Sequence, residues 1–229
     1  MHDLCREVRE SPLMRVCVLD EGKVEDFIKG LSEVERKVTE AIPDGAVDAV
    51  ITELLDVAGV GLEGGAIVGN AGMLSRSVVA VVDLAYDVLK EYFGCDGIKA
   101  CVALVPLIYA SFYTALGVEG MVLEEPNEFG LFMLMYRAFR SDDMERVKSR
   151  FRKRIWGVVN GLGIGEDLKA FAFVKVALSM LTLAVVMITE LAKKDVVEVL
   201  KGLLLYVKGR AFFEEEMIVV IPRKHLLGR

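Results

Sequence analysis

Long stretches without a charged residue set the strongest limit on what this chain can fold into. The longest is the 19-residue run from Ala100 to Val118, and the next is the 14-residue run from Val176 to Thr189. The first is just long enough to cross the roughly 30 Å hydrocarbon layer of a bilayer, whereas the second has the length of a buried core helix. Apolar residues make up 54% of the chain, more than the ~45–50% usual in soluble domains. This excess has to be buried in a core, in contacts between subunits or in a membrane.

Apolar residues recur at three- and four-residue spacing along most of the chain, as in Val24, Phe27 and Leu31. This periodicity predicts a mostly α fold, a multi-helix bundle of about eight helices. We expect the helices near residues 24–42, 47–55, 77–93, 100–118, 126–140, 142–156, 166–191 and 195–209. Residues rich in β-formers predict short strands at 13–19 and 217–221, which can pair as a small two-stranded ribbon formed by the termini.

Nothing along the 229 residues has the composition of a linker, so we expect a single helical domain over residues 1–229. Glutamine is absent and charged residues make up 27% of the chain. Loss of thermolabile amides together with dense charge is typical of thermophile proteins. The charged start of the chain is not followed by the apolar segment of a signal peptide, so we expect a protein of the cytoplasm or of a nucleoprotein particle.

Six glycines lie between Gly59 and Gly72, and the first of them form a Gly-x-Gly-x-x-Gly string followed 19 residues later by Asp83. A dinucleotide site needs a strand before such glycines and a helix opening on them. The preceding segment has helical periodicity instead, so we expect no cofactor. The segment is predicted to be either a helix with a bare groove along Gly61, Gly65 and Gly69 or a flexible loop.

The reactive side chains do not combine into a catalytic or metal-binding motif. The four cysteines contain no Cys-x-x-Cys pair, and both histidines lie near the chain ends, so we expect neither a zinc site nor a nucleophilic triad. A disulfide can join Cys5 to Cys17 or Cys95 to Cys101, and the sequence leaves both open. Asp83 and Asp87 share one helix face, where a solvated polar stripe is the simplest interpretation. An enzyme is therefore the least supported function.

One segment departs clearly from the composition of the rest. Nine residues contain six cations and no acid, namely Arg146, Lys148, Arg150, Arg152, Lys153 and Arg154. Together with Arg137 and Arg140, the stretch carries eight basic and three acidic residues, a local charge of +5 in a chain of net charge −6. On a helix, a narrow apolar stripe leaves most of the surface cationic, which is the footprint of a phosphate-binding surface.

These features predict a self-associating structural protein that binds or coats nucleic acid, of the nucleocapsid or ribonucleoprotein type. Its partners would be further copies of itself and DNA or RNA, bound with little regard to sequence because arginine and lysine without an Asn/Gln set recognise phosphate rather than bases. The alternative for the basic segment is a solvated helix paired with acids elsewhere, or contact with an anionic membrane surface. The alternative for the whole protein is membrane association, anchored by residues 100–118.

Overall fold

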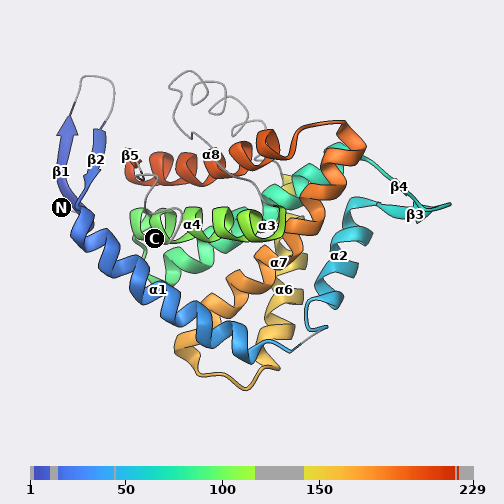
Figure 1. Cartoon of the computed structure of the whole chain (residues 1–229), viewed down its shortest axis with the longest axis horizontal. Helices are drawn as coiled ribbons and strands as arrows, with labels where there is room; N and C mark the ends of the chain where they lie inside the picture. Colours follow the sequence, from blue (N-terminus) through green and yellow to red (C-terminus); the bar gives the residue numbers. More distant parts are fainter. Residues whose placement is uncertain (1–2, 11–14, 44, 117–141, 220, 222–229) are drawn as a thin grey trace.

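The computed structural model describes residues 3–10, 15–43, 45–116, 142–219 and 221 (Figure 1). Helices dominate it, which confirms the predicted mostly α bundle with a small β part. They are α1 (Glu21–Ala41), α2 (Asp48–Ala58), α3 (Ala71–Tyr92), α4 (Gly97–Leu116), α6 (Asp142–Asn160), α7 (Glu166–Ala192) and α8 (Val196–Glu215). The helix expected near 126–140 lies outside the described residues, as does His2 together with His225.

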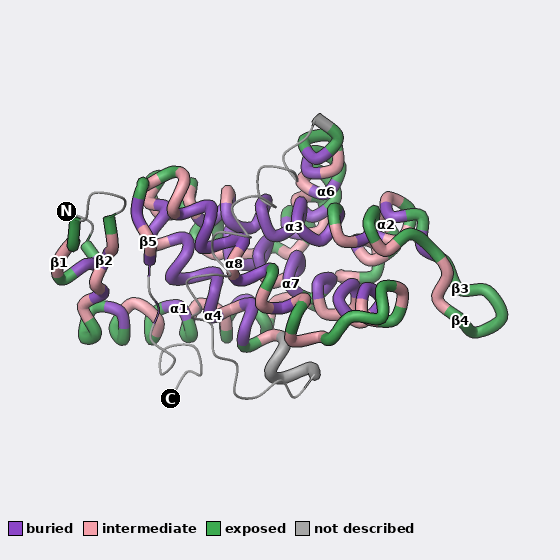
Figure 2. Tube along the Cα trace, turned by 90° about the horizontal axis from the view of Figure 1, so that it is seen from above, coloured by how far each residue is buried: buried purple, intermediate pink, exposed green. Residues whose placement is uncertain are grey.

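The apolar excess of the chain forms an internal core. Helix α7 packs against α3, α1, α4, α6 and α8, and its Phe173, Val176 and Met180 are fully buried. Buried residues concentrate in α3, α4, α7 and α8 (Figure 2). Among the described residues, only Leu62, Met73 and Tyr92 are large apolar side chains with high exposure. The nearly all-apolar helices therefore find their neighbours within one chain.

The segment considered as a membrane anchor forms much of α4, whose residues from Ala100 to Val105 are completely buried. In the described part of the chain, the helix long and apolar enough to cross a membrane is α7 instead, and 72% of its most apolar window is buried. Such a helix is also what the centre of a large soluble core requires. Exposing either of these buried stretches to lipid would require the bundle to unpack.

Strands near the two ends of the chain meet in one sheet. β2 (Arg15–Leu19) pairs in parallel with β5 (Met217–Val219), which confirms the predicted pairing of these segments. A strand that the sequence did not indicate, β1 (Cys5–Glu10), adds to β2 in antiparallel fashion and completes the order β1-β2-β5. A disulfide joins Cys5 to Cys17 across β1 and β2. Cys95 and Cys101 are free thiols, and burial raises the pKa of Cys101 to about 12.

The glycine-rich segment folds as a β-hairpin, so both the helical groove and the irregular loop are wrong. β3 (Gly61–Glu63) pairs antiparallel with β4 (Ala66–Val68), and the hairpin projects from the helical body (Figures 1 and 2). The two residues of its turn, Gly64 and Gly65, have φ values of 60° and 84°. A two-residue turn with positive φ at both positions suits the twist of a hairpin, and glycine adopts it without strain.

Candidate functional site on helix α6

Helix α6 carries the basic segment, and its apolar stripe attaches it to the bundle. Phe151, Ile155 and Val159 are completely buried, and Met144 nearly so, where α6 packs on α3, α2 and α7. The spacing of these residues at three to four positions puts them on one side of the helix. The opposite side faces solvent. Helix α6 therefore has an inner face, a solvent-facing outer face and cations on both.

The inner face contains Lys148, which the sequence grouped with the phosphate-binding cations. The structure buries it to 8% exposure, and its Nζ donates to Asp83 Oδ2 at 2.5 Å and to Asp87 Oδ2 at 2.7 Å. An ammonium group held by two carboxylates below the surface cannot reach a nucleic-acid backbone. Lys148 is therefore removed from the predicted set of phosphate-binding cations, because α3 supplies acids that face it.

The same contacts correct the interpretation of Asp83 and Asp87 as a solvated stripe. Asp83 is only 1% exposed, and it belongs to an ion network between α3, α6 and α8. From α8, Arg210 donates to both aspartates, and the Tyr206 hydroxyl donates to Asp83 Oδ1 at 2.9 Å. Four acids and three bases among the described residues make up the network, namely Asp83, Asp87, Glu145, Glu214, Lys90, Lys148 and Arg210.

Burial and charge act in opposite directions on this network. Burial raises the pKa of Asp83, but the positive charges of Arg210 and Lys148 outweigh it, and the pKa lies below its ordinary value. Burial likewise lowers the pKa of Lys148, and Asp83 with Asp87 outweighs that effect, so this pKa lies above its ordinary value. Both groups are therefore held in their charged forms at neutral pH. Such a network fixes three helices relative to one another rather than supplying an acid or base that titrates near neutrality.

The outer face of α6 carries the remaining cations. Arg146, Arg150, Lys153 and Arg154 are exposed, and Arg152 is half-buried. Three of the five lie beside carboxylates, in the pairs Arg146–Asp143 (2.9 Å), Arg150–Glu53 (2.7 Å) and Arg152–Glu91 (3.9 Å).

Lys153 and Arg154 differ from their neighbours on this face. Within the part of the chain that the structure describes, no carboxylate lies at ion-pair distance from either of them. Arg154 Nε donates to the backbone oxygen of Ala49 at 3.2 Å. Arg137 and Arg140, also predicted to bind phosphate, lie outside the described residues. Arg152 lies toward α3, where it pairs with Glu91. The structure thus brings four of the eight predicted cations, Arg146, Arg150, Lys153 and Arg154, onto one exposed side of α6, which we call the outer α6 face.

Sequence reasoning missed the contribution of α8 to the ion network. Tyr206, Arg210 and Glu214 follow one another at intervals of four residues, so they lie along one side of α8. Asp83 and Asp87 have the same spacing on α3. Two polar stripes of the same spacing, one acidic on α3 and one with a basic residue on α8, were the available signal that these two helices meet through charged side chains.

Comparisons with protein families, curated proteins and solved structures find no match for this chain. Among the described residues, no group of three or more His, Cys, Asp or Glu side chains is placed to hold a metal ion. A proposal about function therefore has to rest on the side chains of α6 and its neighbouring helices.

Proposed function

We propose that this protein binds the phosphate backbone of nucleic acid through the outer α6 face. The observation that carries the proposal is the exposed pair Lys153 and Arg154, which have no carboxylate partner in the described residues and continue the row of Arg146 and Arg150. Arg146, Arg150, Lys153 and Arg154 share one side of the helix by their spacing. The row is about 12 Å long at 1.5 Å per residue, which spans several phosphates of one strand at ~3.4 Å per nucleotide.

The charge of the molecule supports local and salt-sensitive binding. The whole chain has a net charge of −6, so surfaces other than the outer α6 face repel a polyanion and orient it. Each phosphate that a cation neutralises releases condensed counterions, which makes affinity fall as salt rises. Arginine and lysine contacts to phosphate carry no base information, so binding is expected to be sequence-tolerant.

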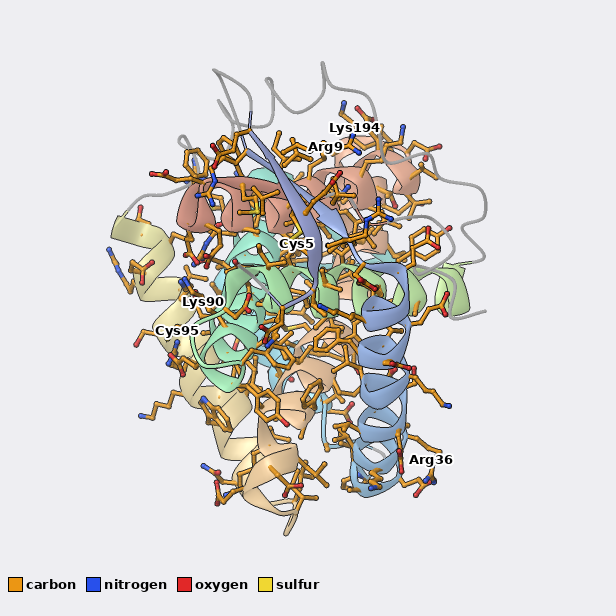
Figure 3. The ribbon with its side chains drawn as sticks, turned by 90° about the vertical axis from the view of Figure 1, so that its left-hand side faces the viewer. Cys5, Arg9, Arg36, Lys90, Cys95 and Lys194 are labelled. Atoms are coloured by element: carbon orange, nitrogen blue, oxygen red, sulfur yellow. A yellow bond between two sulfur atoms is a disulfide. The ribbon has the colours of Figure 1, made fainter. Side chains whose placement is uncertain are left out.

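A triple substitution tests this proposal against a control of equal charge. Arg150, Lys153 and Arg154 are replaced by Ala in one variant, and Arg36, Lys37 and Lys194 in the other. These control cations are also exposed, and Arg36 lies on α1 on the opposite side of the molecule from α6 (Figure 3). Fluorescence anisotropy with short duplex DNA and with single-stranded RNA, from about 50 to about 200 mM salt, gives affinity and its salt dependence for both nucleic acids.

We expect the α6 variant to bind more weakly on all sequences. On duplex DNA, its slope of log affinity against log salt should be flatter by up to about 0.9 for each phosphate that a substituted cation no longer neutralises. The control variant should keep the slope of the parent. Equal behaviour of the two variants would mean that the phosphate-binding cations lie elsewhere. Failure of the parent to bind either nucleic acid at low salt would end the proposal.

The structural, self-associating role of the protein remains a prediction. Because the described core already accommodates the apolar helices, contacts between copies would have to use other surfaces. Light scattering in dilute, detergent-free buffer measures the assembly state with and without nucleic acid. A monodisperse monomer in both conditions would contradict a coat or scaffold function while leaving nucleic-acid binding itself intact.

A further inference from the structure

Helix α2 lies along α6 and brings acidic groups to its cations. The sequence of α2, from Asp48 to Ala58, contains three acids and no base. Arg150 Nε donates to Glu53 Oε1 at 2.9 Å, and Arg150 Nη2 lies 2.7 Å from the same oxygen. One turn further along α6, Arg154 reaches the backbone oxygen of Ala49. Two of the phosphate-binding candidates thus already contact α2.

The Glu53 carboxylate uses the donors that a phosphate would use. Guanidinium nitrogens bind carboxylate and phosphate oxygens with the same planar donor geometry, so the two anions compete for one guanidinium. The side chain of Glu53 is 19% exposed, whereas that of Arg150 is 53% exposed. The arginine is therefore open to solvent on one side while its charge is paired on the other.

We infer that Glu53 is an internal competitor that limits the affinity of the outer α6 face for nucleic-acid phosphate. The inference rests on the proposed function and deepens it, because it names the ion pair that a polyanion has to displace. An exposed ion pair of this kind is weak. A polyanion that binds several cations at once can break it, whereas an isolated anion facing Arg150 alone gains too little. Glu53 thus lowers the affinity of any phosphate that uses Arg150, and a polyanion still binds because its contacts with the other cations are unaffected.

The test removes the competitor and compares it with a matched change of charge. Glu53→Gln keeps the shape of the side chain and raises the net charge by one. Glu40→Gln makes the same charge change on α1, where Glu40 pairs with Arg36 at 2.8 Å away from α6. Each variant is titrated with duplex DNA, with single-stranded RNA and with inorganic phosphate, and Glu53→Gln is also made in an Arg150→Ala background. Circular dichroism checks that every variant is folded.

Glu53→Gln is expected to raise the affinity for nucleic acid about two- to fivefold, the range by which an exposed ion pair shifts an equilibrium. It should also steepen the salt slope by up to about 0.9 on duplex DNA, because one more cation becomes available. Both effects should disappear in the Arg150→Ala background. The affinity for inorganic phosphate, where it binds at Arg150, should rise by no more than the same factor.

The outcomes separate this inference from the function beneath it. If the parent binds nucleic acid and Glu53→Gln behaves like Glu40→Gln, the competitor is refuted and the outer α6 face is still the binding surface. The same conclusion follows if Glu53→Gln raises affinity equally with and without Arg150, since the effect is then one of overall charge. If neither the parent nor Glu53→Gln binds at low salt, both the inference and the proposed function are overturned.

Discussion

Replacing Asp83 by Asn should destabilise the fold more than any change of a surface charge. Asp83 is 1% exposed and accepts hydrogen bonds from Lys148, Tyr206 and Arg210. Asparagine keeps the shape but removes the negative charge, and its amide NH₂ faces groups that act as donors. Lys148 and Arg210, whose side chains are 10% and 4% exposed, then both lose the negative charge of the most deeply buried acid in the network. The acids that remain beside these two cations are at least 22% exposed, so they compensate the buried positive charge less well.

Breaking a buried ion pair in this way costs about 3–5 kcal/mol, a large part of the ~5–15 kcal/mol that stabilises a typical domain. For a chain of this size, each kcal/mol lowers the melting temperature by roughly 2–4 °C, so a fall of about 6–20 °C is expected. Urea denaturation followed by circular dichroism measures the free energy of unfolding directly. Glu40→Gln, which breaks a pair with both side chains more than 60% exposed, should cost under about 1 kcal/mol.

The double variant Asp83→Asn with Lys148→Met should lose less stability than the sum of the two single variants, because the second change removes a charge whose most buried partner the first has already removed. A loss for Asp83→Asn no larger than that for Glu40→Gln would refute the interpretation of the network as a buried clamp. Additive losses in the double variant would show that Asp83 and Lys148 do not act on each other.

Three further predictions concern other parts of the molecule. Replacing Cys5 and Cys17 by Ser removes the disulfide that closes a loop with a sequence separation of 12. Urea denaturation should show that the free energy of unfolding falls by about 3 kcal/mol. An unchanged free energy of unfolding would mean that the disulfide does not restrain the unfolded chain. Gly97→Ala should destabilise the protein because the new Cβ would lie 2.6 Å from a buried tyrosine hydroxyl. Gly202→Ala should instead stabilise α8 by about 0.5–1 kcal/mol, because a Cβ at this position has no atom within 4 Å. Melting temperatures of the two variants that shift in the same direction would contradict this. Burial raises the pKa of Glu214, but two basic side chains outweigh this effect, and the pKa lies below its ordinary value of 4.5. The contribution of Glu214 to stability is therefore present at neutral pH and is lost as the pH falls below that value. A free energy of unfolding that increases when the pH is lowered from about 5 to about 3 would contradict this sign.

Local physics explains which elements the sequence predicts well. The long apolar helix expected at residues 166–191 is α7, Glu166–Ala192, because its ends are set by neighbouring residues. The last helix expected, near 195–209, begins as predicted at Asp195, whose side chain caps it by accepting from the Val197 backbone N–H at 2.7 Å. The pairing of 13–19 with 217–221 was predictable for a similar reason, since two short β-forming segments in a helical chain have few other partners.

Turn chemistry shows where such local prediction falls short. Glycines spaced by four residues satisfy a helical pattern, yet Gly64 and Gly65 form the turn of a hairpin. Glycine is compatible with both because it lacks a Cβ, so its presence alone does not select between them. The deciding contribution is the ladder between β3 and β4, which depends on six residues acting together rather than on any single position.

The sequence by itself determined that the chain is helical, that its apolar excess has to be buried and that its cations cluster on one helix, whereas the structure decided that the excess is buried in an internal core. The sequence could not determine which of those cations face solvent. Lys148 lies inside the fold because Asp83 and Asp87, 65 and 61 residues earlier in the chain, meet it there. Arg150 is paired because Glu53, 97 residues away in sequence, lies on the neighbouring helix. A charge is stable below the surface only where opposite charges compensate its lost hydration, and only the tertiary structure brings those partners together.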